Sequence, residues 1–259
     1  MKVVLFCGGL GMRLRDYSEK IPKPLVEVGL HPILWHLMKY YAHYGHRDFI
    51  LCLGHGGTAI KQYFRNYDET LANDFVMERG GKQIELLRRD IDDWRITFVD
   101  TGASSNIAQR LLRVRHHLEG EKEFLANYAD GLSDLNLDTY LEYFRSRGKI
   151  ACFLSIPAPH TFHVIDADSE HHVRRLTLVS QSSVRVNGGF FVFRREIFEH
   201  IREGEELVVE PFERLAKARQ VLAYPYDGFW RNMDTFKDKI GLDEMWTRDQ
   251  APWRVWKDR

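Results

Sequence analysis

Apolar runs and apolar residues at helical spacing alternate along the first half of the chain. Apolar runs predict buried strands at residues 3–6, 48–53 and 124–128, and alternating polar and apolar residues predict a further strand at 94–99. Apolar residues at helical spacing predict helices at residues 32–44, 58–67, 105–118 and 137–147. Strands that alternate with helices in this way are typical of a mostly parallel sheet. The sequence therefore predicts a doubly wound, Rossmann-like α/β fold with helices on both faces of the sheet.

The pattern changes near residue 149, where short strand-like runs follow one another. We expect strands at residues 150–156, 162–165, 173–178 and 186–193, then a helix at 210–218 and a strand at 221–226. Consecutive short strands predict a smaller antiparallel portion joined to the parallel sheet. Because no linker rich in glycine, proline or serine separates the parts, we expect a single domain over residues 1–259, with halves at 1–148 and 149–259.

A glycine-rich turn follows the first predicted strand. Gly8, Gly9 and Gly11 let the backbone turn sharply and approach a ligand without a Cβ in the way. Consecutive backbone N–H groups beside Arg13 form a natural cradle for an anion. Lys23, placed between two prolines, adds a positive charge on a stiffened backbone. We interpret this combination as a phosphate-binding site; the alternative is a turn whose basic residues only face water.

Composition excludes some classes of partner. The chain has 37 Lys plus Arg and 37 Asp plus Glu, so it has no net charge to attract nucleic acid or an anionic membrane. There is no apolar leader and no run long enough to span a bilayer, and three scattered cysteines fit reduced thiols, so we expect a cytoplasmic protein. None of the 12 histidines pairs with cysteine at zinc-finger spacing.

The glycine turn and the Pro22-Lys23-Pro24 segment together resemble the signature of the sugar-phosphate nucleotidylyltransferases. The segments 32–36 (Pro-Ile-Leu-Trp-His) and 252–256 (Pro-Trp-Arg-Val-Trp) narrow the resemblance to the glucose-1-phosphate cytidylyltransferases, over nearly the whole chain. The resemblance implies that residues 1–148 bind the nucleotide, and that residues 149–259 bind the acceptor and supply the C-terminal tail.

The implied reaction is an in-line attack by an acceptor phosphate on the α-phosphorus of CTP, with pyrophosphate leaving. Both reactants are anions, so the protein must neutralise charge and align atoms, and Mg²⁺ held by one or two carboxylates suits this task. Asp130 and Asp234, each at the end of a predicted strand, are the candidate metal ligands. The alternative for each is a turn-forming or helix-capping residue.

The resemblance also implies roles for individual residues. Arg13 would meet the β- and γ-phosphates and Lys23 the α-phosphate, and both are the predicted catalytic residues. No general base is expected, because the attacking phosphate is already largely deprotonated. The predicted nucleotide-binding residues are Gly8, Gly9, Leu10, Gly11, Met12, Arg13, Lys23, Thr101, Gly102 and Asp130. Met12 stands where relatives usually carry threonine or serine.

The acceptor side departs from the family pattern. Asn187, Gly188 and Glu210 match acceptor-binding positions of the family. The lysine that would hold the sugar phosphate is absent from segment 179–183 (Val-Ser-Gln-Ser-Ser), and Arg185 is the candidate replacement.

We therefore predict a Mg²⁺-dependent cytidylyltransferase that uses CTP and a small phosphorylated acceptor, by default glucose 1-phosphate, to form CDP-glucose and pyrophosphate. The alternatives are another sugar phosphate, a non-sugar phosphate or a phosphonate as acceptor, a different nucleoside triphosphate, or a non-catalytic nucleotide-binding regulator. We expect a homo-oligomer. Trp253 and Trp256 in the tail would serve either as a packing surface between subunits or as an intramolecular clasp.

Overall fold

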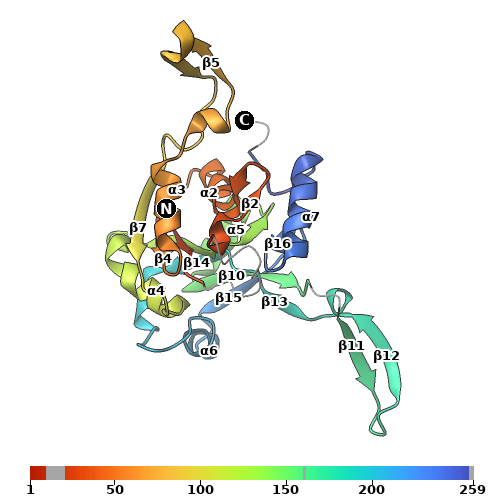
Figure 1. Cartoon of the computed structure of the whole chain (residues 1–259). Helices are drawn as coiled ribbons and strands as arrows, with labels where there is room; N and C mark the ends of the chain where they lie inside the picture. Colours follow the sequence, from red (N-terminus) through yellow and green to blue (C-terminus); the bar gives the residue numbers. More distant parts are fainter. Residues whose placement is uncertain (10–20, 160–161, 257–259) are drawn as a thin grey trace.

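The computed structural model describes residues 1–9, 21–159 and 162–256. Its centre is a mixed sheet in which four neighbouring strands run parallel in the order β8-β1-β4-β7 (Figure 1). These strands are β1 (Lys2–Phe6), β4 (Asp48–Leu53), β7 (Arg95–Asp100) and β8 (Glu123–Tyr128). They agree with the predicted strands to within a residue or two, and the predicted doubly wound fold is confirmed.

The second half of the chain extends the same sheet. Strand β14 (Phe191–Arg194) runs antiparallel between β8 and β10 (Ala151–Pro157), and β13 (Arg185–Asn187) also pairs with β10. Strand β15 (Val221–Pro225) pairs with β10 in parallel. Within this sheet, therefore, the antiparallel portion expected after residue 149 consists of β13 and β14, whereas β10 and β15 continue the parallel direction.

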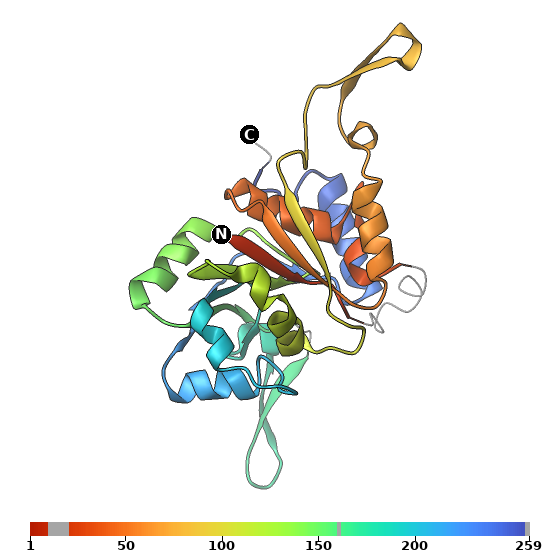
Figure 2. The same ribbon diagram turned by 90° about the vertical axis from the view of Figure 1, so that its left-hand side faces the viewer.

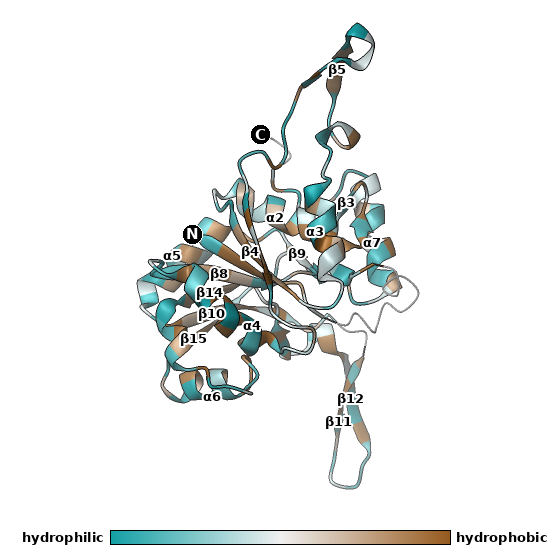
Figure 3. Ribbon diagram, turned by 60° about the vertical axis from the view of Figure 1, so that its left-hand side comes forward, coloured by the Kyte–Doolittle hydropathy of each residue, from teal (hydrophilic) through white to brown (hydrophobic). Residues whose placement is uncertain are grey.

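Both faces of the sheet are buried because each strand sends alternate side chains into two different cores. In β1, Val3 and Leu5 enter one core and Val4 and Phe6 enter the other. Hydrophobic colouring marks the central strands, and helices cover both faces (Figures 2 and 3). The first core is packed by α2 (Ile33–His43), α3 (Gly57–Arg65), α5 (Leu137–Arg147) and α7 (Phe236–Thr247), and the second by α4 (Ile107–Val114) and α6 (Glu210–Lys217).

A small ribbon beyond the main sheet brings distant acidic residues together. Strand β9 (Gly131–Ser133) pairs antiparallel with β16 (Trp230–Asn232), so that Gly131 lies opposite Asn232. The Met233 N–H donates to the Asp130 carbonyl at 2.9 Å. The segment after β8 and the segment after β16 therefore end beside each other.

Two hairpins project away from the body of the molecule (Figure 1). One consists of β5 (Phe75–Glu78) and β6 (Gln83–Leu86), and the other of β11 (His163–Ala167) and β12 (Val173–Leu178). Each strand pairs only with its own hairpin partner. The sequence did not predict β5 and β6, since their exposed residues leave no buried face for a pattern to mark.

The C-terminal tail closes onto helix α2. Trp253 is fully buried, stacks on Phe229 at 5.5 Å between ring centroids, and directs its indole N–H to His36 Nδ1 at 3.5 Å. Of the two alternatives for the tail, Trp253 thus forms the intramolecular clasp. No helix in the described part of the chain is both long enough and apolar enough to cross a membrane.

Candidate active site

A hollow of about 250 Å³ opens where β1 and β8 end. Parallel strands end at the same edge of a sheet, and ligands of open α/β sheets bind there. The residues that line the hollow are Phe6, Cys7, Gly8, Gly9, Lys23, Pro24, Ser105, Asn106, Ile107, Arg110, Tyr128, Ala129, Asp130 and Glu206. Four predicted site residues, Gly8, Gly9, Lys23 and Asp130, thus share one hollow.

Lys23 lies between the two predicted metal ligands. Its Nζ atom is 2.5 Å from Asp130 Oδ2 and 2.5 Å from Asp234 Oδ1. A 3-10 turn, η2 (Lys23–Leu25), sets its backbone, because the Leu25 N–H donates to the Pro22 carbonyl at 2.8 Å. Burial alone would lower the pKa of Lys23, but the Asp130 and Asp234 carboxylates outweigh burial and raise this pKa above its usual value.

The two carboxylates suit a divalent cation. Both converge on one point of positive charge, and Asn232 Nδ2 donates to Asp234 Oδ2 at 2.5 Å, which orients that carboxylate. Mg²⁺ prefers hard oxygen donors and takes only one or two carboxylates when substrate phosphates complete its shell. Asp130 and Asp234 are therefore the candidate pair for such a cation. No group of three or more His, Cys, Asp or Glu side chains fit for a metal occurs within residues 1–9, 21–159 and 162–256.

Arg110 supports the floor of the hollow from below. Its guanidinium is buried and donates to the carbonyls of Gly8, Leu53 and Gly102 and to the Thr101 hydroxyl. Desolvation lowers the pKa of Arg110. A Cβ at Gly8 would collide with this guanidinium, whereas a Cβ at Gly9 would meet nothing within 4 Å. Glycine is therefore required at Gly8 by close packing.

Thr101 and Gly102 lie behind the hollow, and neither lines it. The Thr101 hydroxyl donates to the Leu53 carbonyl at 2.7 Å and accepts from Arg110 at 2.7 Å. Gly102 has a left-handed φ of +84°, a conformation that favours glycine. Both residues hold the Arg110 side chain. Leu10, Gly11, Met12 and Arg13 lie outside the described residues.

Asn187 and Gly188 lie next to the ribbon that carries the acidic residues. The Trp230 indole N–H donates to the Gly188 carbonyl at 2.8 Å, and Trp230 belongs to β16, which precedes Asp234. Asn187 Oδ1 accepts from the Gly189 N–H at 2.9 Å, and this bond holds the turn between β13 and β14. Gly188 is therefore bonded to the strand that leads to Asp234, and Asn187 precedes it in the chain.

Arg185, the candidate replacement for the missing lysine, is bound within the protein. It donates to Ser155 Oγ at 3.1 Å, the Ser155 carbonyl at 2.6 Å, the Tyr226 carbonyl at 2.8 Å and Asp227 at 2.8 Å. An arginine has five N–H donors, so these bonds leave one. Arg185 ties β13, β10 and the end of β15 together.

Glu210 begins α6, and its side chain accepts from the Glu206 N–H at 3.0 Å. Glu206 itself lines the hollow. The sequence analysis assigned no role to Glu206 or to Arg110. Arg110 falls within the predicted helix at residues 105–118 and Glu206 lies in a loop, and no feature of the sequence marked a functional role for either residue.

Comparison with known proteins identifies the family to which this chain belongs. The sequence profile described as "Nucleotidyl transferase" matches residues 2–245, and the chain belongs to this family of enzymes. The glucose-1-phosphate cytidylyltransferases of Salmonella typhi and Salmonella typhimurium are each 34% identical over 258 residues, which is 99% of this chain and 100% of theirs. The structure of a UDP-glucose pyrophosphorylase complexed with UDP-glucose has a TM-score of 0.70 at 13% identity, over 96% of this chain and 98% of that one.

Proposed function

We propose that this enzyme transfers CMP from CTP to glucose 1-phosphate, forming CDP-glucose and pyrophosphate. The observation that carries the proposal is the convergence of Asp130 and Asp234 on Lys23, at the edge of a hollow floored by Gly8 and Gly9. Full-length similarity to two glucose-1-phosphate cytidylyltransferases supports the choice of substrates.

In the proposed reaction, a phosphate oxygen of glucose 1-phosphate attacks the α-phosphorus of CTP. The bond between the α-phosphorus and the oxygen leading to the β-phosphate breaks, and pyrophosphate leaves. Asp130 and Asp234 would hold Mg²⁺, which supplies charge neutralisation on the phosphate oxygens when it is bound. Lys23 stabilises the negative charge that gathers on the α-phosphate in the transition state.

The glycine turn positions the nucleotide in this proposal. Gly8 and Gly9 allow the phosphates to approach the backbone. Leu10, Gly11, Met12 and Arg13 lie outside the described residues; in this proposal they also bind the nucleotide, Arg13 through the β- and γ-phosphates. Arg110 keeps Gly8 in place from below. Each of these residues aligns or neutralises charge, so no proton transfer through a side chain is required.

Pyrophosphate release from the purified protein tests the proposal. We expect CTP with glucose 1-phosphate and Mg²⁺ to give the highest rate in a panel of the four nucleoside triphosphates, with CDP-glucose as the second product. The Asp130→Asn variant is the control for a contaminating enzyme. Equal rates with another nucleoside triphosphate would contradict the assignment of CTP, and no pyrophosphate with any pair would contradict the reaction.

A second candidate keeps the chemistry and changes the acceptor to another phosphate or a phosphonate. Two observations favour it: segment 179–183 lacks lysine, and four of the donors of Arg185 are engaged inside the protein. A lost charge-assisted contact is worth about 1.5–3 kcal/mol, or roughly ten- to a hundredfold in efficiency. A kcat/KM for glucose 1-phosphate of about 10⁴ M⁻¹s⁻¹ or above would exclude this candidate.

We also propose a cytoplasmic homo-oligomer. Segments 71–87 and 162–184, which include the two hairpins, hold 12 of the 17 large hydrophobic side chains that are exposed in the described residues. A two-stranded hairpin is marginally stable alone, so a cover from a second copy is expected. Light scattering should give a mass above 30.5 kDa, the mass of one chain. A monomer at micromolar concentration would contradict this assignment.

A further inference from the structure

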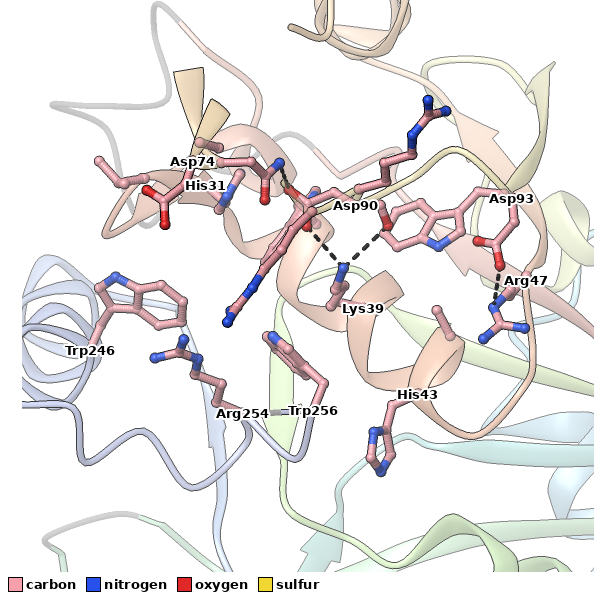
Figure 4. Close-up of a pocket in the computed structure, with 18 residues that line it drawn as sticks. His31, Lys39, His43, Arg47, Asp74, Asp90, Asp93, Trp246, Arg254 and Trp256 are labelled. Carbon is pink, nitrogen blue, oxygen red and sulfur yellow. Dashed lines mark hydrogen bonds and ion pairs between the residues drawn. The ribbon is translucent and has the colours of Figure 1, made fainter. Parts of the chain in front are cut away.

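A second hollow, larger than the one at the active site, lies on the outer side of helix α2. It encloses about 690 Å³, and none of the residues that line it lines the active-site hollow. Figure 4 shows Trp246, Arg254 and Trp256, from α7 and the C-terminal segment, facing Lys39 and Asp90 across it. Ligand pockets in proteins commonly have volumes of about 300–1,000 Å³, so the hollow is large enough for a small molecule.

Aromatic rings form much of its wall. Four of the six tryptophans of the chain line it: Trp35, Trp94, Trp246 and Trp256. The His31 and Trp35 rings stack with centroids 3.8 Å apart and planes 9° apart, and both are nearly fully buried, so their orientation is fixed. Half-buried Trp246 and Trp256 leave part of their surface open. Such rings favour a ligand with a flat aromatic group.

Charged side chains line the wall, and four of the cations are paired with a carboxylate: Lys39 with Asp90, Arg47 with Asp93, Arg89 with Asp92, and Arg254 with Asp249. Five cationic residues line the hollow (Lys39, Arg47, Arg88, Arg89 and Arg254), against three carboxylates (Asp74, Asp90 and Asp93). The Asp90 carboxylate is already bound within the protein, since it accepts hydrogen bonds from Lys39 at 3.0 Å, from Asn73 at 2.8 Å and from Tyr67 at 3.2 Å.

Two arginines retain donors for a ligand. Arg254 pairs with Asp249 through Nη1 at 2.9 Å and lies 5.0 Å from the Trp246 ring. An arginine has five N–H donors, so further terminal N–H groups of Arg254 remain for an anionic ligand. Arg88 is exposed, and within the described part of the chain it has no ion pair.

From this arrangement we propose that the hollow is a second binding site, for a ligand that combines a flat aromatic ring with a phosphate group, the chemical class of nucleotides. The ring packs against Trp246 and Trp256, and the phosphate pairs with the guanidinium groups of Arg88 and Arg254. The proposal does not depend on which nucleotide or acceptor the active site uses, because the two hollows share no lining residue.

Titration calorimetry of the full-length protein with CMP and with ADP tests the site, with tryptophan fluorescence as a second readout. We expect more than one nucleotide per chain for at least one probe, and quenching of fluorescence as the second site fills. Arg88→Ala and Arg254→Ala should each weaken binding to this site by about tenfold or more, since each removes a charge-assisted contact. Arg88 is exposed, so its variant should fold. Arg175→Ala, at an exposed arginine on β12, is the matched control.

The KM for CTP should be unchanged in Arg88→Ala, which separates this site from the active site. A stoichiometry of one nucleotide per chain for both probes, with affinities that Arg88→Ala leaves unchanged, would overturn the proposal. Equal affinities of the wild type, Arg88→Ala and Arg254→Ala at the second site would also overturn it. Because binding is measured without turnover, failure of the proposed reaction would leave these results interpretable.

Discussion

Acidification should destabilise this protein through histidines that are buried in their neutral form, above all His36. His36 is fully buried, its Nε2 atom lies 2.8 Å from the Val28 carbonyl and must donate to it, and its Nδ1 atom accepts from Trp253. A proton on Nδ1 would therefore face the Trp253 N–H, donor against donor. Burial lowers the pKa of His36 to about 3, and burial likewise lowers the pKa of His31 to about 4.

The direction and size of this pH effect on the free energy of unfolding follow from proton linkage. Well above pH 6.5, the usual histidine pKa, neither the folded nor the unfolded chain carries these protons, so the two histidines do not reduce the free energy of unfolding. Below it, the unfolded chain takes up protons that the folded chain refuses, so stability is lost progressively toward pH 3–4. At pH 5.5 each histidine lowers the free energy of unfolding by about 1.4 kcal/mol, which is about 3 kcal/mol for His31 and His36 together.

Urea unfolding between pH 7.5 and 5.5 measures this loss. The wild type should lose about 3 kcal/mol from these two histidines, and His36→Gln should lose about 1.4 kcal/mol less than the wild type over the same range, whatever its absolute stability. His31→Gln offers the same comparison if the first variant does not fold. His55→Gln, at an exposed histidine, should match the wild type. An unchanged pH dependence in both His36→Gln and His31→Gln would refute the reasoning.

Three further predictions concern the active site. Asp130→Asn should lower turnover about a hundredfold or more, because it removes a main electrostatic contributor, and a chelator should abolish wild-type activity until Mg²⁺ is restored. Lys23→Ala should reduce kcat more than the affinity for CTP, because its charge acts mainly in the transition state. Gly8→Ala should weaken CTP binding more than Gly9→Ala does, because a Cβ at Gly8 would displace the Arg110 guanidinium, whereas a Cβ at Gly9 meets no protein atom within 4 Å.

Each of these can be contradicted by one measurement. Near-normal steady-state turnover of folded Asp130→Asn would place the metal elsewhere. A raised KM for CTP at unchanged kcat would assign Lys23 to ground-state binding. Equal CTP dissociation constants for the Gly8 and Gly9 variants in calorimetry would show that the close packing against Arg110 has no bearing on the nucleotide.

The parallel strands and the glycine turn could be predicted from sequence because their causes are local. Strand β1 is an uninterrupted apolar run, since both of its faces are buried, and glycines follow it where the backbone turns. Hairpin β5–β6 could not be predicted in the same way, because its residues are exposed and no periodic burial marks them. Arg110 fell within the predicted helix at residues 105–118, but nothing in the sequence showed that its guanidinium lies under Gly8.

The sequence by itself determined which residue types were available: a glycine turn, a lysine between prolines, and two carboxylates at the ends of strands. Tertiary structure alone decided that these residues meet. Asp234 and Lys23 are 211 positions apart, and they are adjacent because β16 pairs with β9 beside the end of β8. Likewise, it was the folded chain that gathered four tryptophans around the second hollow. The pattern of apolar and polar residues along the sequence indicates which residues are buried, whereas contacts between distant residues depend on how the strands and helices pack.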